Sequence, residues 1–201
     1  MQSFQVVKCP YCGAQHRMVK PAKKLKDYEM YSDGKTVSSE LNEALEVSRC
    51  SKCNEFFWIE DAAVEVNPVE EELPIVRSLS IIEYVEMLTD NTQTVTPDEE
   101  EILRMELLWA FNDRVRQGKS LFESEDEKTI WLTNMNALSE LLDESDVYSR
   151  MIKAEIAREQ GNFELAEKLL SSIKEAQLMP IKKMMLNAIS HDETEVFKIE
   201  M

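Results

Sequence analysis

The chain has 201 residues, of which 43% are hydrophobic, and it carries a formal net charge of −16 at pH 7. This apolar content argues against global disorder, and no apolar run reaches the ~18 residues that a membrane-spanning helix needs. The first residues, MQSFQVVKCP, lack the charged start and long apolar stretch of a signal peptide. All four cysteines fall in two Cys-x-x-Cys pairs, so none is left for a disulfide framework. We therefore expect a cytoplasmic protein with no membrane segment.

The charge is unevenly distributed along the chain. Residues 1–26 contain six basic residues and no acidic one, whereas residues 61–201 contain 14 basic and 31 acidic residues. The long acidic part should repel nucleic acid and anionic lipid, which leaves only the first segment able to attract them. The six basic residues are Lys8, Arg17, Lys20, Lys23, Lys24 and Lys26.

Residues 1–66 show the pattern of short β segments separated by turns. The segments are FQVV, YEMY, ALEVSR, FFWIE and AVEV, and SDGK at 32–35 is a hairpin-turn signal after YEMY. NPVEEELP at 67–74 contains two prolines around a run of acids, which is typical of a linker. We predict a small β-rich domain over 1–66, a linker over 67–74 and a second domain over 75–201.

From residue 75 onward the apolar period changes from two to about 3.6, which predicts helices. A first helix is expected to bury one stripe, and a second to begin at the capping box of Thr96 and Glu99 and to stop at Gly118. Four more helices are expected: one that carries Trp131 and Leu138, and three near 146–159, 162–177 and 180–190. The last stretch, 192–201, fits either a short helix or a frayed end. The first stripe comprises Ile75, Leu79, Ile82, Val85 and Leu88. The predicted fold class is α+β, with a small β-rich domain followed by a larger all-α domain.

The motif CPYC at Cys9–Cys12 has two chemical interpretations. In glutaredoxin-like enzymes such a dithiol begins a helix, whose dipole lowers the thiol pKa. Here CGAQHRMVKPAKK follows, and it has no helical apolar face. A second pair, Cys50 and Cys53, follows after 37 intervening residues. The context therefore favours a metal site over a redox dithiol.

Two Cys-x-x-Cys turns together supply four soft ligands for one tetrahedral Zn²⁺. We assign Cys9, Cys12, Cys50 and Cys53 to one structural zinc in a zinc-ribbon-like domain, because so small a β-rich segment needs metal to fold securely. Ligand identity does not distinguish zinc from rubredoxin-type iron. His16 is a weaker alternative ligand. A closed four-thiolate site has no open position, so the metal should not be catalytic.

AEIAREQGNFELAEKLLSSI at 154–173 looks like half of a tetratricopeptide repeat, within a predicted helical hairpin near 146–177. Gly161 marks the turn, and Phe163, Ala166 and Leu170 follow at the expected spacing. No second copy is visible at a spacing of 34 residues, so an extended solenoid is not predicted.

The whole arrangement resembles a group of uncharacterised bacterial proteins. These join an N-terminal four-cysteine zinc ribbon, carrying a YSDG-like hairpin, to a helical part with a W-x-x-N-D helix and a tetratricopeptide-like end. The resemblance implies the architecture and a bacterial cytoplasmic setting, but no activity. Besides the four cysteines, the matching residues are Tyr31–Gly34, Trp109–Asp113 and 154–166.

Asn112 and Asn134 each follow a tryptophan by three residues and face the apolar side of a predicted helix. Buried amides of this kind usually bond a neighbouring helix; the sharper hypothesis is a shared polar pocket for a small ligand. We expect Asp113, Arg114 and Arg116 to form solvent-facing ion pairs.

No catalytic constellation is apparent, so we predict a non-enzymatic interaction or scaffold protein that binds another protein. The alternative is nucleic-acid binding through the basic zinc ribbon, with nearby aromatic side chains for stacking. Three methionines at the last helix favour core packing, with a partner-binding groove as the lesser hypothesis. The aromatic residues are Tyr11, Tyr28, Tyr31, Phe56 and Trp58; the methionines are Met179, Met184 and Met185.

Overall fold

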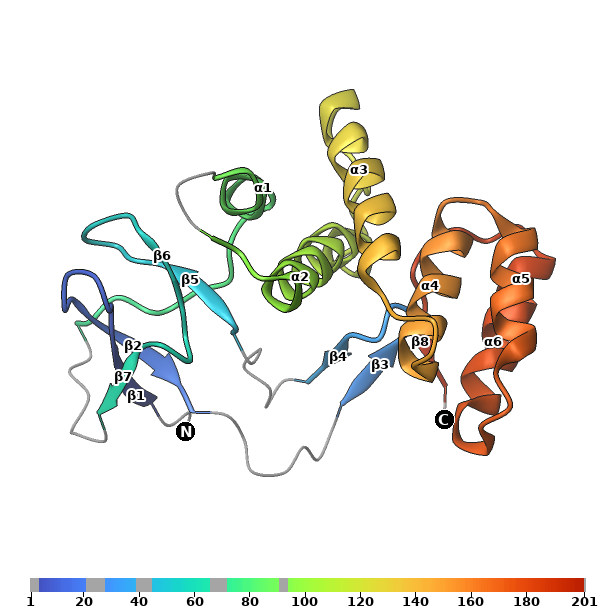
Figure 1. Cartoon of the computed structure of the whole chain (residues 1–201), viewed down its shortest axis with the longest axis horizontal. Helices are drawn as coiled ribbons and strands as arrows, with labels where there is room; N and C mark the ends of the chain where they lie inside the picture. The colour runs from blue at the N-terminus through green and yellow to red at the C-terminus, as the bar shows by residue number, and fades with distance from the viewer. Residues whose placement is uncertain (1–3, 21–27, 39–44, 66–71, 91–93, 201) are drawn as a thin grey trace. The chain divides into compact units, whose positions relative to one another are not determined.

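The computed structural model describes residues 4–20, 28–38, 45–65, 72–90 and 94–200. A region of short strands over residues 4–65 precedes six α-helices in the described chain (Figure 1), as the sequence predicts. The chain forms two compact units: residues 1–28 with 37–87, and residues 29–36 with 88–201. We call them the strand unit and the helical unit. These units differ from the two predicted domains in two segments. Residues 29–36 belong to the helical unit, and residues 75–87 belong to the strand unit.

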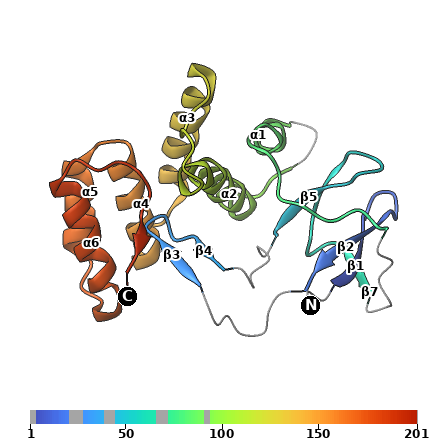
Figure 2. The same ribbon diagram turned by 180° about the vertical axis from the view of Figure 1, so that it is seen from behind.

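The strand unit contains two small antiparallel sheets (Figure 2). In the first, the order is β2-β1-β7, and Val7 of β1 lies opposite His16 and Val64. In the second, β5 pairs with β6. β2 was not among the predicted strands, because QHRMV has no clear alternation of apolar residues. The strands are β1 (Phe4–Lys8), β2 (Gln15–Val19), β5 (Val47–Arg49), β6 (Phe56–Trp58) and β7 (Ala63–Glu65).

The core of the strand unit includes two of the four cysteines. Residues 74–76 are joined to β2, since Arg17 N–H donates to the Pro74 carbonyl at 2.8 Å and Val76 N–H donates to the Arg17 carbonyl at 2.9 Å. Most of the predicted linker, residues 67–71, lies outside the described residues. The buried core residues are Val7, Cys9, Cys50, Phe57, Ala62 and Val76.

Helix α1 (Ile81–Thr89) begins later than predicted. Its start is set by a capping box that the sequence analysis missed: Glu83 N–H donates to Ser80 Oγ at 3.3 Å, and Ser80 N–H donates to the Glu83 carboxylate at 2.9 Å. Ile75 and Leu79 therefore precede the helix, and Ile82 is 55% exposed. The predicted stripe is wrong at these three positions.

The helical unit contains the five remaining α-helices. The capping box of Thr96 and Glu99 starts α2 as predicted, and Gly118 follows its end with φ of 70°. The helix expected over 162–177 is shorter, because the backbone becomes extended at Ile173 and a 3₁₀ turn, η1 (Ala176–Leu178), precedes the next helix. The helices are α2 (Pro97–Arg116), α3 (Glu125–Leu141), α4 (Val147–Glu159), α5 (Phe163–Ser172) and α6 (Met179–Ser190).

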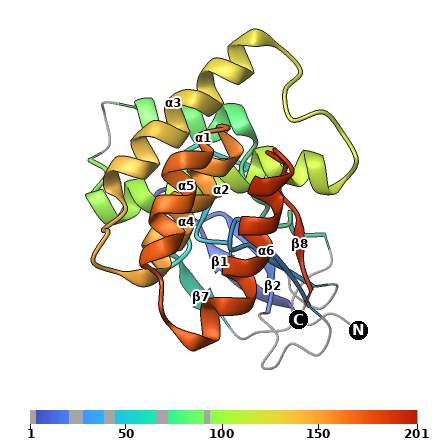
Figure 3. The same cartoon turned by 90° about the vertical axis from the view of Figure 1, so that its right-hand side faces the viewer.

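Helices α4, α5 and α6 pack against one another (Figure 3) around a shared apolar core. Ala157, Ala166 and Leu170 are each at most 2% exposed, so small and apolar side chains face each other across the turn at Gly161. None of the helices in the described part of the chain is both long and apolar enough to cross a bilayer.

A third sheet belongs to the helical unit. The hairpin of β3 (Glu29–Tyr31) and β4 (Thr36–Val37) is joined by β8 (Lys198–Ile199), in the order β4-β3-β8. Strand β8, near the end of the chain, accordingly lies beside β3 (Figure 2). Within the described part of the final stretch, Lys198–Ile199 thus forms a short strand, which neither of the two predicted alternatives included.

Candidate metal centre

Two turns of the same backbone design carry the four cysteines. One lies between β1 and β2, and the other lies between β5 and β6. In the first, Cys9 N–H donates to the Ala14 carbonyl and Gly13 N–H donates to the Cys9 carbonyl, both at 2.9 Å. In the second, Cys50 N–H donates to the Glu55 carbonyl at 2.9 Å, and Asn54 N–H donates to the Cys50 carbonyl at 3.0 Å. The two turns therefore have the same pattern of backbone hydrogen bonds.

The residue after each second cysteine adopts a left-handed conformation. Gly13 has φ of 69°, and Asn54 has φ of 63°. Glycine and asparagine tolerate this region best, so CPYCG and CSKCN encode the turn locally. Each turn therefore presents its two cysteines from a short, defined loop, with Cys9 and Cys50 buried.

All four cysteine Sγ atoms lie within 4.8 Å of one another. The Sγ atoms of Cys9 and Cys53 are 3.8 Å apart, and those of Cys12 and Cys50 are 3.7 Å apart. Disulfide bonding would need about 2.05 Å. A regular tetrahedron with metal–sulfur bonds of about 2.3 Å has sulfurs about 3.8 Å apart. The four predicted ligands are thus brought together at the spacing that one metal ion requires.

The electrostatics of the cluster call for a cation. Burial raises the pKa of Cys50, but backbone N–H groups of Cys53 and Lys52 outweigh it and lower the pKa to about 7. Glu55 N–H lowers the pKa of Cys53, yet burial and the neighbouring sulfurs raise it to about 12. One thiolate therefore forms readily, whereas further negative charge at this spacing is costly unless a positive ion balances it.

His16 supports the two turns and is not one of the grouped ligands. Its ring is buried, Ser51 N–H donates to its Nε2 at 3.2 Å, and its Nδ1 lies 3.2 Å from the Ala14 carbonyl. Because Nε2 accepts, the ring hydrogen is on Nδ1 and donates to Ala14. His16 thus connects the turn of Cys12 with that of Cys50, a role that the sequence did not indicate.

No helix begins at the CPYC motif. Cys12 is followed by Gly13 and then by strand β2. The helix dipole that lowers a thiol pKa in glutaredoxin-like enzymes is therefore missing at this motif, as the sequence predicted.

The helical unit contains a second polar group of residues, centred on the tip of the β3–β4 hairpin. The side chain of Asp33 is fully buried, and its carboxylate accepts from Asn112 Nδ2 at 3.0 Å and from Arg116. Trp109 Nε1 donates to the Asp33 carbonyl at 3.1 Å, and Asn112 also donates to Glu159 at 2.9 Å. We call Asp33, Trp109, Asn112, Arg116 and Glu159 the buried polar cluster. The YSDG and W-x-x-N-D segments thus meet here.

Arg116 is not the solvent-facing residue that the sequence analysis expected. Its side chain is only 7% exposed, it pairs with Asp33 and with Asp113 at 2.7 Å, and its guanidinium carbon lies 4.6 Å from the centre of the Tyr31 ring. The prediction failed because it treated Arg116 as an end-of-helix cation, whereas the hairpin covers it. Arg114 pairs with Glu127 at 2.6 Å.

Asn112 and Asn134 have separate partners. Asn134 is 2% exposed, and its Nδ2 donates to the Arg104 carbonyl of α2 at 2.9 Å. Asn112 joins α2 to Asp33 and Glu159. Each amide therefore fastens neighbouring elements, as the simpler prediction held, and the structure does not bring the two into a common pocket.

Arg158 is a buried charge that sequence reasoning missed. Its guanidinium is paired with Glu155 at 2.6 Å, and both side chains are fully buried. It also donates to the carbonyls of Glu193 at 2.5 Å and Glu195 at 3.0 Å. Arg158 therefore fixes the segment that leads into β8.

Glu159 gives the buried polar cluster a pH dependence. Burial, followed by the nearby charges of Glu155 and Asp33, raises its pKa well above the ordinary value of 4.5, against smaller opposing effects of Arg158 and Asn112. The folded protein therefore keeps a proton that the unfolded chain loses near pH 4.5, and its stability falls as the pH rises above that value. Glu159→Gln should accordingly be more stable than the wild type at pH 8, with the difference vanishing toward pH 4.5.

Urea unfolding followed by far-UV circular dichroism at both pH values measures this difference. Glu140→Gln, at an exposed position of α3, is the matched control and should give the same stability difference from the wild type at both pH values. A Glu159→Gln protein that is less stable than the wild type at pH 8 would contradict the assignment.

Two aromatic side chains suggested for nucleic-acid stacking have other contacts. Tyr31 lies against Arg116, and Phe56 is buried with the Arg49 guanidinium 4.8 Å from its ring centre. Tyr11 is 60% exposed. Three of the six basic residues, Lys23, Lys24 and Lys26, lie outside the described residues.

No relative supplies a role for the four cysteines or for the buried polar cluster, because comparison of the chain with protein-family models, curated proteins and solved structures found no match.

Proposed function

We propose that the chain is a non-enzymatic interaction protein in which Cys9, Cys12, Cys50 and Cys53 hold one structural Zn²⁺. The observation that carries the proposal is the group of four Sγ atoms within 4.8 Å, presented by two equivalent turns. Such a pair of turns is the design of a zinc ribbon, and four thiolates close the coordination shell. The ion would stabilise the strand unit and perform no chemistry.

The strand unit is small and β-rich, and its core includes two of the four ligands, Cys9 and Cys50. These properties favour zinc over iron. The folding of such units is commonly coupled to zinc. A reducing compartment such as the bacterial cytoplasm would keep the four thiols available, in keeping with the resemblance to bacterial zinc-ribbon proteins.

The helical unit would supply the binding surface. Three of its charged residues form hydrogen bonds that join the hairpin, the helices and the C-terminal segment: Asp33, Arg116 and Arg158. The α4–α5 pair has the tetratricopeptide-like signature around Gly161, and repeats of that kind present side chains to other proteins. We therefore assign recognition, and not catalysis, to this unit.

Affinity purification from native cell extract tests the proposal, with the full-length, metal-loaded protein as bait. We expect a specific partner in near-stoichiometric amount that does not bind an unrelated bait of equal charge. Recovery of no specific partner with the bait in excess would contradict the proposal. Salt-dependent binding of labelled single-stranded DNA or RNA to the full-length protein would instead favour the nucleic-acid alternative.

A further inference from the structure

Helix α6 differs in charge from the rest of the helical unit. Residues 176–191 contain Lys182 and Lys183 but no acidic residue, although the whole chain has a net charge of −16. Each of the other five described helices includes at least one Asp or Glu. The α6 surface is therefore a locally positive part of a strongly acidic protein.

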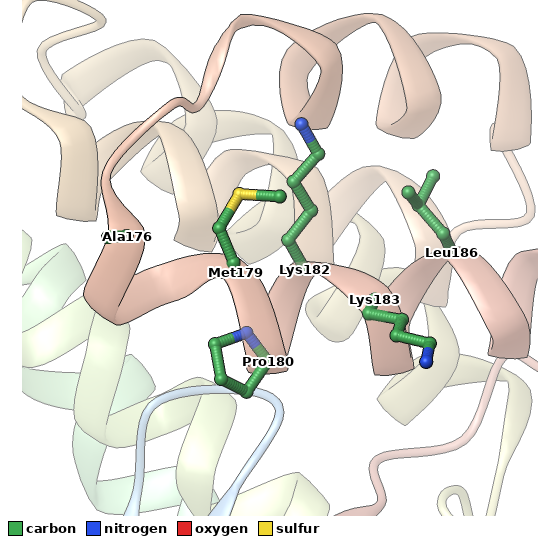
Figure 4. A pocket seen from close by; sticks show the side chains of 6 residues that line it. All are labelled: Ala176, Met179, Pro180, Lys182, Lys183 and Leu186. Atoms are coloured by element: carbon green, nitrogen blue, oxygen red, sulfur yellow. The ribbon is translucent and has the colours of Figure 1, made fainter.

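The two sides of α6 are used differently. Met185 and Ile189 are buried in the core shared with α4 and α5. Met179, Lys182, Lys183 and Leu186 stand at positions i, i+3, i+4 and i+7, which share one face of the helix. Leu186 is half-buried at the edge of this face, against the core, and Figure 4 shows Met179, Lys182 and Leu186 projecting from the helix together. With Ala176 and Pro180, these four residues line an open groove of about 610 Å³.

The groove combines an apolar floor with uncompensated positive charge. Met179 is 43% exposed, and a flexible thioether adapts to different partners. Lys182 Nζ donates to the Ile173 carbonyl at 3.0 Å. None of the ion pairs found among the described residues includes Lys182 or Lys183. Carboxylates beside apolar side chains would complement both features.

We propose that this groove, lined by Met179, Lys182, Lys183 and Leu186, binds an amphipathic helix of another protein that carries acidic residues beside its apolar face. The inference rests on the proposed function and specifies the surface and the partner chemistry. A helix is the fitting occupant because α6 already packs on α5, so a helix in the groove would be the next layer of the same stack. An amphipathic helix that enters a groove uses anchors at i, i+3, i+4 and i+7 of its own sequence, and the groove residues on α6 offer one continuous face for such anchors.

A displayed library of amphipathic 18-residue helical peptides tests this inference. The apolar face is kept fixed, and the flanking positions are randomised among Glu, Lys, Gln and Ser. Selection on the full-length, zinc-loaded protein should enrich Glu at the flanking positions, and the selected peptides should bind more weakly as salt concentration rises. Enrichment of Lys, or no enrichment, would overturn the proposal.

Variants then locate the binding site of a selected peptide. Lys183→Glu and Met179→Ser should each weaken binding, measured by fluorescence anisotropy, by about tenfold. Lys168→Glu makes the same charge change at an exposed position of α5 and should bind like the wild type. Lys182 is left intact because it caps the Ile173 carbonyl. Equal affinity for Lys183→Glu and the wild type would place the peptide elsewhere and overturn the proposal.

Two further measurements distinguish a helix-binding groove from self-association of the chain and from binding of the partner at another surface. A wild-type dimer in analytical ultracentrifugation that Met179→Ser dissociates would assign the groove to a second copy of the chain and overturn the proposal. A native partner that binds Lys183→Glu and Met179→Ser as tightly as the wild type would also overturn it, while leaving the proposed function intact.

Discussion

Removing the metal with a strong chelator is expected to unfold the strand unit while the helical unit keeps its structure. The thiols of Cys9 and Cys50 lie in the core of the strand unit, so losing the ion leaves several sulfurs to be accommodated without a counter-charge. Far-UV circular dichroism should retain most of its helical signal, whereas amide NMR resonances of β1, β2, β5 and β6 should collapse to unfolded positions. Restoring zinc should reverse the change.

A cysteine variant makes the same test without chelator. Cys50→Ser should abolish stoichiometric metal binding and lower the free energy of unfolding of the strand unit by more than about 4 kcal/mol, because metal loss is among the largest single effects known. Lys52→Ala is the matched control: it lies in the same turn, its side chain is exposed and its N–H to Cys50 Sγ is retained. A strand unit that stays folded in Cys50→Ser would contradict the structural role of the metal.

Arg116→Met is expected to destabilise the helical unit strongly. It removes the guanidinium from a fully buried Asp33 carboxylate, leaving that charge with hydrogen bonds from Asn112 and the Lys35 N–H. Breaking a buried ion pair on one side costs about 3–5 kcal/mol. Urea unfolding monitored at 222 nm should show a loss of this size.

The double variant Asp33→Asn with Arg116→Met separates the pair from simple packing. Because it removes both charges, its loss of stability should be smaller than that of Arg116→Met alone. Lys198→Met, which removes one partner of the half-exposed Glu29–Lys198 pair, should leave the unfolding midpoint unchanged. A stability loss below about 1 kcal/mol in Arg116→Met would show that Asp33 does not depend on this partner.

The metal centre was predictable because its information is local. Each Cys-x-x-Cys turn, with Gly13 or Asn54 after it, specifies its own geometry, and convergence of the two follows from the preference of one metal for four thiolates. The role of His16 was not predictable, since it depends on Ser51, which is 35 residues away. The identity of the metal remains a prediction, because zinc and iron share this ligand set.

The positions of the helices were predictable where the sequence contains a capping motif and a regular spacing of apolar residues. The start of α2 followed from Thr96 and Glu99, whereas α1 was misplaced because the equivalent signal at Ser80 and Glu83 was overlooked. The tetratricopeptide-like and bacterial resemblances remain predictions.

The buried polar cluster and β8 could not be read from the sequence. Asp33 and Arg116 are 83 residues apart, and Met30 of β3 pairs with the distant Ile199 of β8. The segment DRVRQG predicts a solvent-exposed Arg116, because the hairpin that covers this residue comes from a distant part of the chain. Partners of this kind are set by tertiary packing, which local periodicity does not encode.

X-ray absorption spectroscopy of the purified protein, with metal quantification on the same sample, tests the central claim most directly. The account predicts one zinc per chain surrounded by four sulfurs at about 2.3 Å. A protein without stoichiometric metal, or a shell in which nitrogen replaces one of the sulfurs, would contradict it.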